Sequence, residues 1–151
     1  MSHRGQAAPF RWEGVEVRAY KETAGPEGSE AFRDVTRQEL TGAEHGQGTS
    51  LRYFEVGPGG HTTLERHEHT HVVVPIRGRG SALIVDRVVS LAPHDLVFVP
   101  SWGWHQFRAE REEPFGFLCA VVLDRDRPVL PTESDLAQLR RNPEIAEFIR
   151  V

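Results

Sequence analysis

Disulfides, membrane spans and secretion signals are all missing from this sequence. It contains one cysteine, Cys119, so no internal disulfide can form and the disulfide framework of small secreted domains is excluded. No apolar run approaches the roughly 18 residues that a membrane-spanning helix requires, and the polar first residues lack the apolar stretch of a secretory signal. We therefore expect a cytoplasmic protein with no membrane partner.

Blocks of basic residues are missing as well. Lys and Arg total 18 against 22 Asp and Glu, which gives a formal net charge of −4 without a long stretch of either sign. Nucleic-acid binding normally requires a basic patch, so nucleic acid is not an expected partner. A chain of 151 residues with 38% hydrophobic and 26% charged residues is instead typical of one globular domain.

Short runs rich in Val, Ile, Phe and Thr occupy the middle of the sequence, from Ser50 to Val122, and Gly and Pro separate them. Such a pattern predicts an antiparallel sandwich or barrel, and eight short strands suit a jelly roll. The predicted strands are 51–56, 61–67, 71–77, 81–85, 88–91, 96–99, 105–109 and 115–122, with turns at 57–60, 78–80, 93–95 and 100–103.

The flanking segments are predicted to extend this core rather than to form a second domain. Apolar residues alternate with polar ones in 15–20 and less cleanly in 32–40, which indicates added edge strands, while 22–30 is expected to be a loop. After the core, Thr132 can cap one short helix, and Asn142 before Pro143 can start another. The predicted division is an N-terminal arm (1–49), a barrel (50–125) and a C-terminal helical tail (126–151).

Histidines are concentrated in one stretch of the sequence. Six of the eight lie between positions 61 and 105, and three of them alternate at 67, 69 and 71. Neutral imidazole is a ligand for Mn, Fe, Co, Ni, Cu and Zn, so we interpret this tract as a metal site rather than as a polar strand edge. The histidines expected at the surface are His3, His45, His61 and His94.

Two stretches of the sequence resemble the two motifs of the cupin family. The first, Gly59 to Gly78, contains the histidine tract, and the second, His94 to His105, keeps the Pro and the final His at the family spacing. The resemblance implies an all-β fold, a cupin jelly-roll barrel with N-terminal arm strands and a short C-terminal helix. It also implies a divalent metal and a homodimer, because cupins commonly pair by sheet extension.

Counting without gaps across the first motif puts Glu65, His67 and His71 at the family's ligand positions, and His105 comes from the second motif. By the period of two in a strand, Glu65 and His67 would point to one face. One carboxylate and three imidazoles suit Mn(II), Fe(II), Co(II) or Ni(II), with Zn also possible. Among these metals, the resemblance favours Mn.

A competing alignment takes His67 and His69 as the His-x-His pair of the motif. It leaves only Thr70 to turn the chain before His71, whereas a hairpin loop normally needs about two residues. We therefore predict the set with Glu65 and keep His69 as the alternative ligand.

Cys119 follows His105 by 14 residues in a Phe-Leu-Cys run. A thiol in a strand is usually a small apolar filler. Small manganese cupins with a four-histidine site carry a similar run at this distance, however, and the resemblance implies a thiol that faces the metal, where a thiolate is nucleophilic. Candidate substrate-binding residues are the arginines Arg66, Arg52 and Arg108, which match phosphate in shape and charge, and Trp102, which could wall a pocket.

Among cupins, the whole chain is similar to the methylsulfurylase-type proteins of bacterial methionine salvage. The residues behind this resemblance are the run that starts at Arg52, Glu65-Arg66-His67, the run that ends at Arg108 and Pro131-Thr132-Glu133. The resemblance implies a small-molecule substrate, methylthioxylulose phosphate, from which the methylthio group is removed with manganese and glutathione, with Cys119 as the catalytic thiol. The alternatives are a cupin dioxygenase or isomerase that acts on another small molecule, and a non-catalytic ligand-binding cupin.

Overall fold

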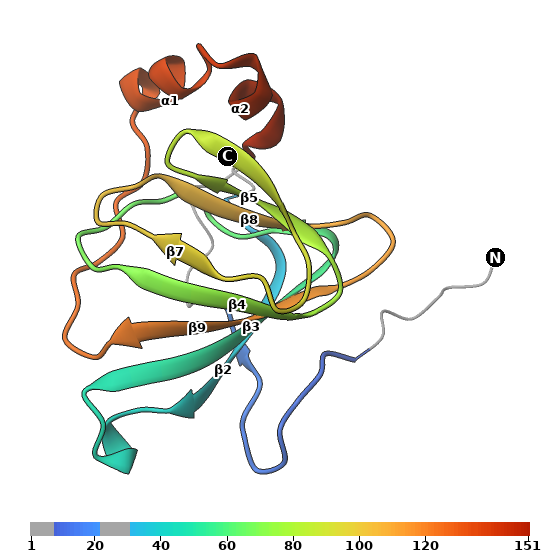
Figure 1. Ribbon diagram of the computed structural model, residues 1–151, viewed down its shortest axis with the longest axis vertical. Helices are drawn as coiled ribbons and strands as arrows, with labels where there is room; N and C mark the ends of the chain where they lie inside the picture. The colour runs from blue at the N-terminus through green and yellow to red at the C-terminus, as the bar shows by residue number, and fades with distance from the viewer. Residues whose placement is uncertain (1–7, 22–30) are drawn as a thin grey trace.

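The computed structural model describes residues 8–21 and 31–151, so the predicted loop at 22–30 and His3 lie outside the described residues (Figure 1). A curled antiparallel sheet forms the body of the protein, and two short helices follow it. The strands are β1 (Arg18–Ala19), β2 (Arg33–Thr41), β3 (Thr49–His61), β4 (His71–Arg77), β5 (Gly80–Ile84), β6 (Arg87–Leu91), β7 (Val97–Val99), β8 (His105–Ala109) and β9 (Phe115–Val122). The helices are the 3-10 turn η1 (Ala43–His45), α1 (Glu133–Leu139) and α2 (Pro143–Phe148).

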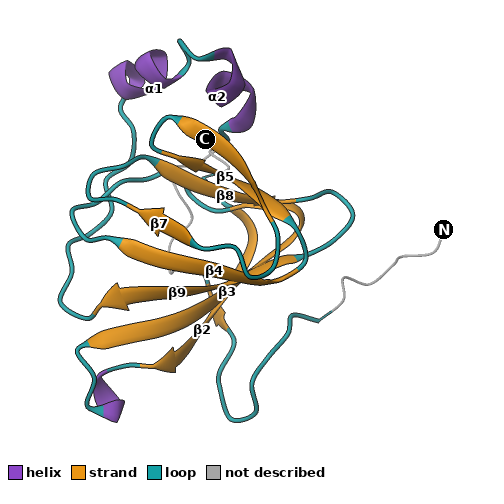
Figure 2. Cartoon of the chain, viewed as in Figure 1, coloured by secondary structure: helices purple, strands orange, loops and turns teal. Residues whose placement is uncertain are grey.

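The strand order is β6-β5-β8-β3-β9-β4-β7, with β2 also paired to β3 and β1 paired to β2. Figure 2 shows how this sheet curls on itself, with β5 and β8 on one side and β4, β9 and β3 on the other. The predicted jelly-roll barrel is confirmed, as are both edge strands of the N-terminal arm.

The long strand β3 joins the two sides of the sheet. It pairs with β9 from Thr49 to Val56, and at its other end His61 pairs with Arg108 of β8. The predicted turn at 57–60 is therefore wrong, because β3 continues through it. Gly59 takes a φ of +73°, which L residues with a side chain rarely adopt, and its N–H donates to the carbonyl of Glu110 at 2.8 Å. A glycine of this kind lets a strand bend without ending.

The predicted strand at 61–67 is also wrong. Between His61 and the start of β4, the chain forms only two isolated bridges, Glu65 with His105 and Arg66 with Val129. Side chains replace part of the ladder here: Thr62 Oγ1 accepts from the N–H of Phe107 at 2.8 Å, and Gln106 Nε2 donates to the carbonyl of Thr62 at 2.8 Å. Once such side chains satisfy backbone groups, a regular strand is not needed. His61, expected at the surface, is buried at 3% exposure.

The two C-terminal helices begin where the caps predict. Thr132 accepts a hydrogen bond from the N–H of Asp135, and Asn142 accepts from the N–H groups of Glu144 and Ile145. Within the described residues, no helix has the length and apolar character needed to cross a membrane.

The hydrophobic residues pack in two clusters. The larger lies inside the curled sheet, and the smaller joins the barrel to the tail through Leu64, Leu83, Ile145, Phe148 and Ile149. Complete burial of an aliphatic or aromatic side chain contributes about 1.5–3 kcal/mol, which fixes the short helices against the barrel.

Polar groups of β8 also hold the tail. Arg108 donates to the carbonyl of Phe148 at 2.8 Å, with its guanidinium 5.0 Å from the centre of the Phe148 ring. Gln106 accepts from the N–H of Arg150 at 2.9 Å and donates to its carbonyl at 2.8 Å. The run that ends at Arg108 therefore anchors the C-terminus.

Candidate metal centre and its cavity

A cavity of about 210 Å³ opens into the interior of the curled sheet. Its size lies below the roughly 300–1,000 Å³ of pockets for drug-sized ligands, so it suits a small molecule. The strands supply pairs of lining residues two positions apart, as the alternation of a strand requires: Arg52 and Phe54, His71 and Val73, His105 and Phe107, Phe117 and Cys119. The rest of the lining is Tyr20, Lys21, Arg37, Thr62, Thr63, Glu65, His67, His69, Arg125, Asp126 and Pro128.

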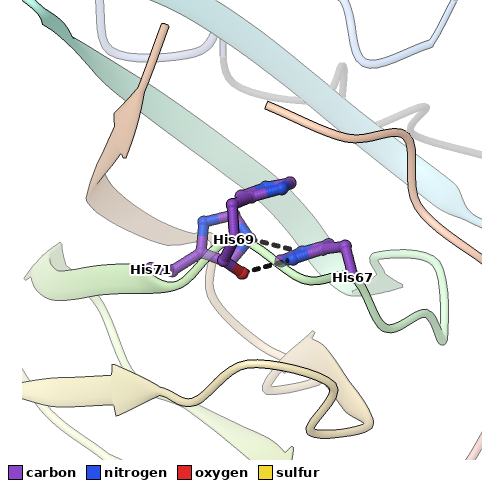
Figure 3. Close-up of side chains that lie close together, drawn as sticks. All are labelled: His67, His69 and His71. Atoms are coloured by element: carbon purple, nitrogen blue, oxygen red, sulfur yellow. Dashed lines mark hydrogen bonds between the residues drawn. The ribbon is translucent and has the colours of Figure 1, made fainter. Parts of the chain in front are cut away.

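All five candidate metal ligands line this cavity. Glu65, His67 and His105 form one group whose ligand atoms lie within 4.8 Å of one another, and His67, His69 and His71 form a second. His67 belongs to both groups. Its Nε2 lies 2.7 Å from Nε2 of His71, and its ring stacks on that of His69 with centroids 3.6 Å apart (Figure 3).

Backbone carbonyls fix the orientation of two of these imidazoles. Nδ1 of His67 donates to the carbonyl of His69 at 2.7 Å, and Nδ1 of His105 donates to the carbonyl of Gly103 at 2.9 Å. A carbonyl can only accept, so each ring carries its hydrogen on Nδ1 and presents the lone pair of Nε2 to the cavity. Metal-binding histidines are commonly oriented in this way.

Three of these imidazoles, those of His67, His71 and His105, are neutral at neutral pH. Burial first, and then the charge of the neighbouring His105, lower the pKa of His67 to about 4. Burial likewise lowers the pKa of His71 and of His105 below the ordinary value. Because a metal binds the neutral ring, these three rings are in the charge state that metal binding requires.

Glu65 and His69 have different partners. Glu65 Oε2 accepts a hydrogen bond of 2.7 Å from the Lys21 ammonium, so a cation already neutralises this carboxylate. Nδ1 of His69 lies 2.8 Å from Asp126 Oδ1. Asp126 also accepts hydrogen bonds from the backbone N–H groups of Glu68 and His69. These bonds lower the pKa of Asp126, and the bond from Glu68 has the largest effect. An ionised carboxylate behind a histidine orients the other ring nitrogen toward a metal.

The turn argument that favoured Glu65 over His69 does not hold. It assumed a regular strand through His67 and a tight hairpin at Thr70, whereas the chain bends irregularly from 67 to 70 before β4 begins. This bend allows His69 to share the cavity with His67 and His71. The donor set of imidazoles and a carboxylate is compatible with a divalent metal.

Cys119 faces the cavity from β9 and is 2% exposed. Its Sγ lies 3.0 Å from Nδ1 of His71 and 3.6 Å from Nη2 of Arg52. Burial raises the pKa of the thiol, and the guanidinium of Arg52 opposes this shift. The thiol therefore lies between the histidine cluster and a buried cation.

Of the four candidate substrate-binding residues, Arg52 lines this cavity, whereas Arg66, Trp102 and Arg108 do not. Arg66 lies 4.5 Å from the centre of the Trp104 ring, in a groove against the C-terminal helices. Trp102 is half exposed, and its backbone N–H donates to the carbonyl of His67. Arg108 holds the C-terminal tail.

Several cavity residues were not identified from the sequence: Tyr20, Lys21, Arg37, Arg125 and Asp126. They lie in the arm and after β9, outside both motifs, and only the alternation in 15–20 and 32–40 predicted that the arm joins the sheet. Tyr20 shares a T-shaped ring contact with Phe54, and its hydroxyl accepts from the N–H of Thr63 at 3.4 Å. These contacts place Lys21 beside Glu65.

Comparisons with known proteins agree with this architecture. Residues 52–121 match the family described as "Cupin domain". The chain is 54% identical to the 1-methylthio-D-xylulose 5-phosphate methylsulfurylase of Rhodospirillum rubrum over 140 residues, which cover 93% of this chain and 86% of that protein.

Two solved structures are similar over nearly their whole lengths. A cupin-2 domain from Rhodospirillum rubrum is 51% identical, with a TM-score of 0.87 and coverage of 96% of this chain and 94% of that one. A cupin 2 conserved barrel domain protein from Rhodopseudomonas palustris is 49% identical, with a TM-score of 0.86 and coverage of 99% and 100%. The fold, the two motifs and the sequence identities together show that the chain belongs to the cupin family.

Proposed function

We propose that this protein is a metal-dependent enzyme that removes the methylthio group from 1-methylthio-D-xylulose 5-phosphate, with glutathione as the thiol co-substrate. The observation that carries the proposal is the position of Cys119, whose thiol shares one small cavity with the histidine cluster. The 54% identity to a protein named for this activity supports the choice of substrate.

His67, His71 and His105, together with His69 or Glu65, would hold the metal, which is manganese in the family resemblance. When bound, a divalent ion stabilises negative charge on the oxygens of a keto sugar. The hydrogen bonds from Nδ1 of His67 and His105 to carbonyls keep these rings in place, so little reorganisation is required when the ligand enters.

The sulfur transfer requires a nucleophile, and Cys119 supplies it. Its thiolate attacks the methylthio sulfur, a new S–S bond forms, and the electrons of the broken C–S bond remain on the sugar as an enolate, which takes a proton to become a methyl ketone. The glutathione thiolate then attacks the methylthio sulfur and releases the Cys119 thiolate. The products are deoxyxylulose phosphate and the methyl disulfide of glutathione.

Arg52 and Lys21 fit the charge changes in this sequence. The guanidinium of Arg52, 3.6 Å from Sγ, favours the thiolate of Cys119. The Lys21 ammonium lines the same cavity and is held by Glu65, so it can donate the proton that the enolate takes up.

The experiment is turnover of the methylthio sugar phosphate by the manganese-loaded protein with glutathione. Cys119→Ser should abolish product formation and still retain the metal, because Ser keeps the size of the side chain and removes the thiol. Unchanged turnover in this variant would show direct attack by glutathione. No turnover by the manganese-loaded wild type, together with oxygen uptake in the presence of Fe(II), would overturn the proposal in favour of a dioxygenase. The homodimer and the cytoplasmic location expected from the sequence stay predictions.

A further inference from the structure

Three arginines line the cavity. Arg37 comes from β2, Arg52 from β3 and Arg125 from the segment after β9. The register of the sheet places two of them near each other, since Arg37 lies opposite Phe54 in the β2–β3 pair and Arg52, two residues before Phe54, lies opposite Cys119 in the β3–β9 pair. Arg52 is only 9% exposed, and its guanidinium packs 4.9 Å from the centre of the Phe54 ring.

These guanidinium groups have unused hydrogen-bonding capacity. The Nε atoms of Arg37 and Arg52 are buried without a hydrogen-bond partner. Within residues 8–21 and 31–151, no carboxylate forms an ion pair with any of the three arginines. Glu39, an acid close to Arg125, is in an ion pair with Arg18 instead. A buried N–H donor without an acceptor is costly, and a buried charge without a counterion is more so.

The arginines also repel one another. The pKa of Arg125 is lowered by burial first and then by the charge of Arg52, and Arg37 adds to the effect. A ligand with two negative charges would remove this repulsion and would give both Nε atoms acceptors. A guanidinium binds phosphate through two parallel N–H groups, for which Nε and one Nη are suited.

We propose that Arg37, Arg52 and Arg125 form a subsite for the phosphate group of a phosphate monoester. The inference rests on the proposed function for its sugar phosphate and assigns the residues that recognise the phosphate. Its geometry is consistent with one ligand that reaches both ends of the cavity: Arg52 contacts Cys119, and Cys119 contacts His71 of the histidine cluster. The phosphate and the reacting sulfur then lie on either side of the thiol.

This subsite makes the phosphate a determinant of specificity. Recognition by three cations favours a dianionic phosphate over a single carboxylate, because each added charge contributes to the attraction. Arg66 and Arg108 take no part, since both lie outside the cavity lining.

The test is calorimetric titration of the full-length protein with inorganic phosphate at constant ionic strength. Wild type should bind phosphate, and Arg52→Lys, Arg37→Gln and Arg125→Gln should each weaken binding by roughly tenfold or more. Arg127→Gln is the matched control, because it removes the same charge from an exposed residue outside the cavity lining and should change the affinity less than twofold. Melting temperatures show whether each variant is folded, and the partly exposed Arg125 provides the test if Arg52→Lys does not fold.

Failure of the subsite and failure of the proposed function give different results. If wild type converts the sugar phosphate but the arginine variants bind phosphate as wild type does and keep its KM, the subsite is wrong and the function stands. If wild type binds phosphate and only the cavity variants lose it, yet no turnover occurs, the subsite stands and the proposed function falls. Wild type that does not bind phosphate at millimolar concentration overturns the subsite.

Discussion

The Lys21 ammonium donates a hydrogen bond of 2.7 Å to the Glu65 carboxylate, and this ion pair ties the N-terminal arm to the wall of the cavity. The two residues are 44 positions apart in the sequence. Their contact has a consequence for metal binding, because a carboxylate that already has a cation partner is a weaker candidate ligand than an imidazole whose Nε2 is free.

His69→Ala should therefore lower manganese affinity more than Glu65→Ala does. His69 is oriented by Asp126, whereas Glu65 is engaged by Lys21. Isothermal titration with Mn(II) compares the two variants directly. A larger loss of manganese affinity in Glu65→Ala would identify Glu65 as the ligand, in agreement with the ungapped alignment of the first motif.

Asp126→Asn should lower manganese affinity by roughly 10- to 100-fold, because a partner that orients a metal-binding histidine has effects of this size. The amide keeps the shape of the side chain but loses the negative charge that faces Nδ1 of His69. Asp124→Asn, a change in a neighbouring exposed acid, is the control and should leave the affinity unchanged. Equal affinities in the two variants would remove His69 from the metal centre.

His67→Ala and His105→Ala should each strip the metal from the purified protein. Their Nε2 atoms face the cavity, and His67 belongs to both groups of candidate ligands. Elemental analysis measures the metal content. The control is His94→Ala, a change at an exposed turn residue, which should retain the metal. A full equivalent of metal in both cavity variants would place the centre elsewhere.

The metal-free protein should lose stability as the pH falls. Burial lowers the pKa of His67 from 6.5 to about 4, so the unfolded chain binds protons before the folded one does. Stability is therefore retained above about pH 7 and declines as the pH falls through the unfolded pKa toward the folded one. Urea unfolding of chelator-treated protein measures this slope, which should be shallower in His67→Asn. A slope unchanged by the substitution would contradict the shift.

Phe148→Ala should destabilise the protein by about 3 kcal/mol, because it leaves a cavity in the cluster between α2 and the barrel. The guanidinium of Arg108 would lose its ring contact as well. Urea unfolding compares this variant with Glu147→Ala, an exposed change in the same helix. If both variants unfold like wild type, the tail does not contribute to the stability of the barrel.

The sequence predicted those features that depend on local pattern. Alternating apolar residues marked β4, β5, β8 and β9, and the caps at Thr132 and Asn142 marked the helices. The stretch after His61 was mispredicted as a strand because part of its backbone is hydrogen-bonded by side chains from other segments, such as Tyr20 and Gln106. The division into arm, barrel and tail stays a prediction.

The candidate site was predictable where its residues belong to the cupin motifs or to the runs around Arg52 and Cys119 that resemble known cupins. Each of the five candidate ligands and Cys119 lines the cavity. Lys21, Arg37 and Arg125 reach it through long-range packing of the arm and the segment after β9, which no local spacing encodes. Arginines in the motifs, such as Arg66, were more conspicuous in the sequence but lie on other surfaces.

The most direct test of the central claim, that Cys119 accepts the methylthio group, is an intact-mass measurement after a single turnover. The manganese-loaded protein is mixed with excess methylthio sugar phosphate in the absence of glutathione, and the reaction is quenched in acid. We predict that the protein gains the mass of one methylthio group on Cys119, that glutathione removes it, and that Cys119→Ser gains none. Release of the deoxy sugar phosphate only when glutathione is present, with no mass added to the wild-type protein, would contradict the account.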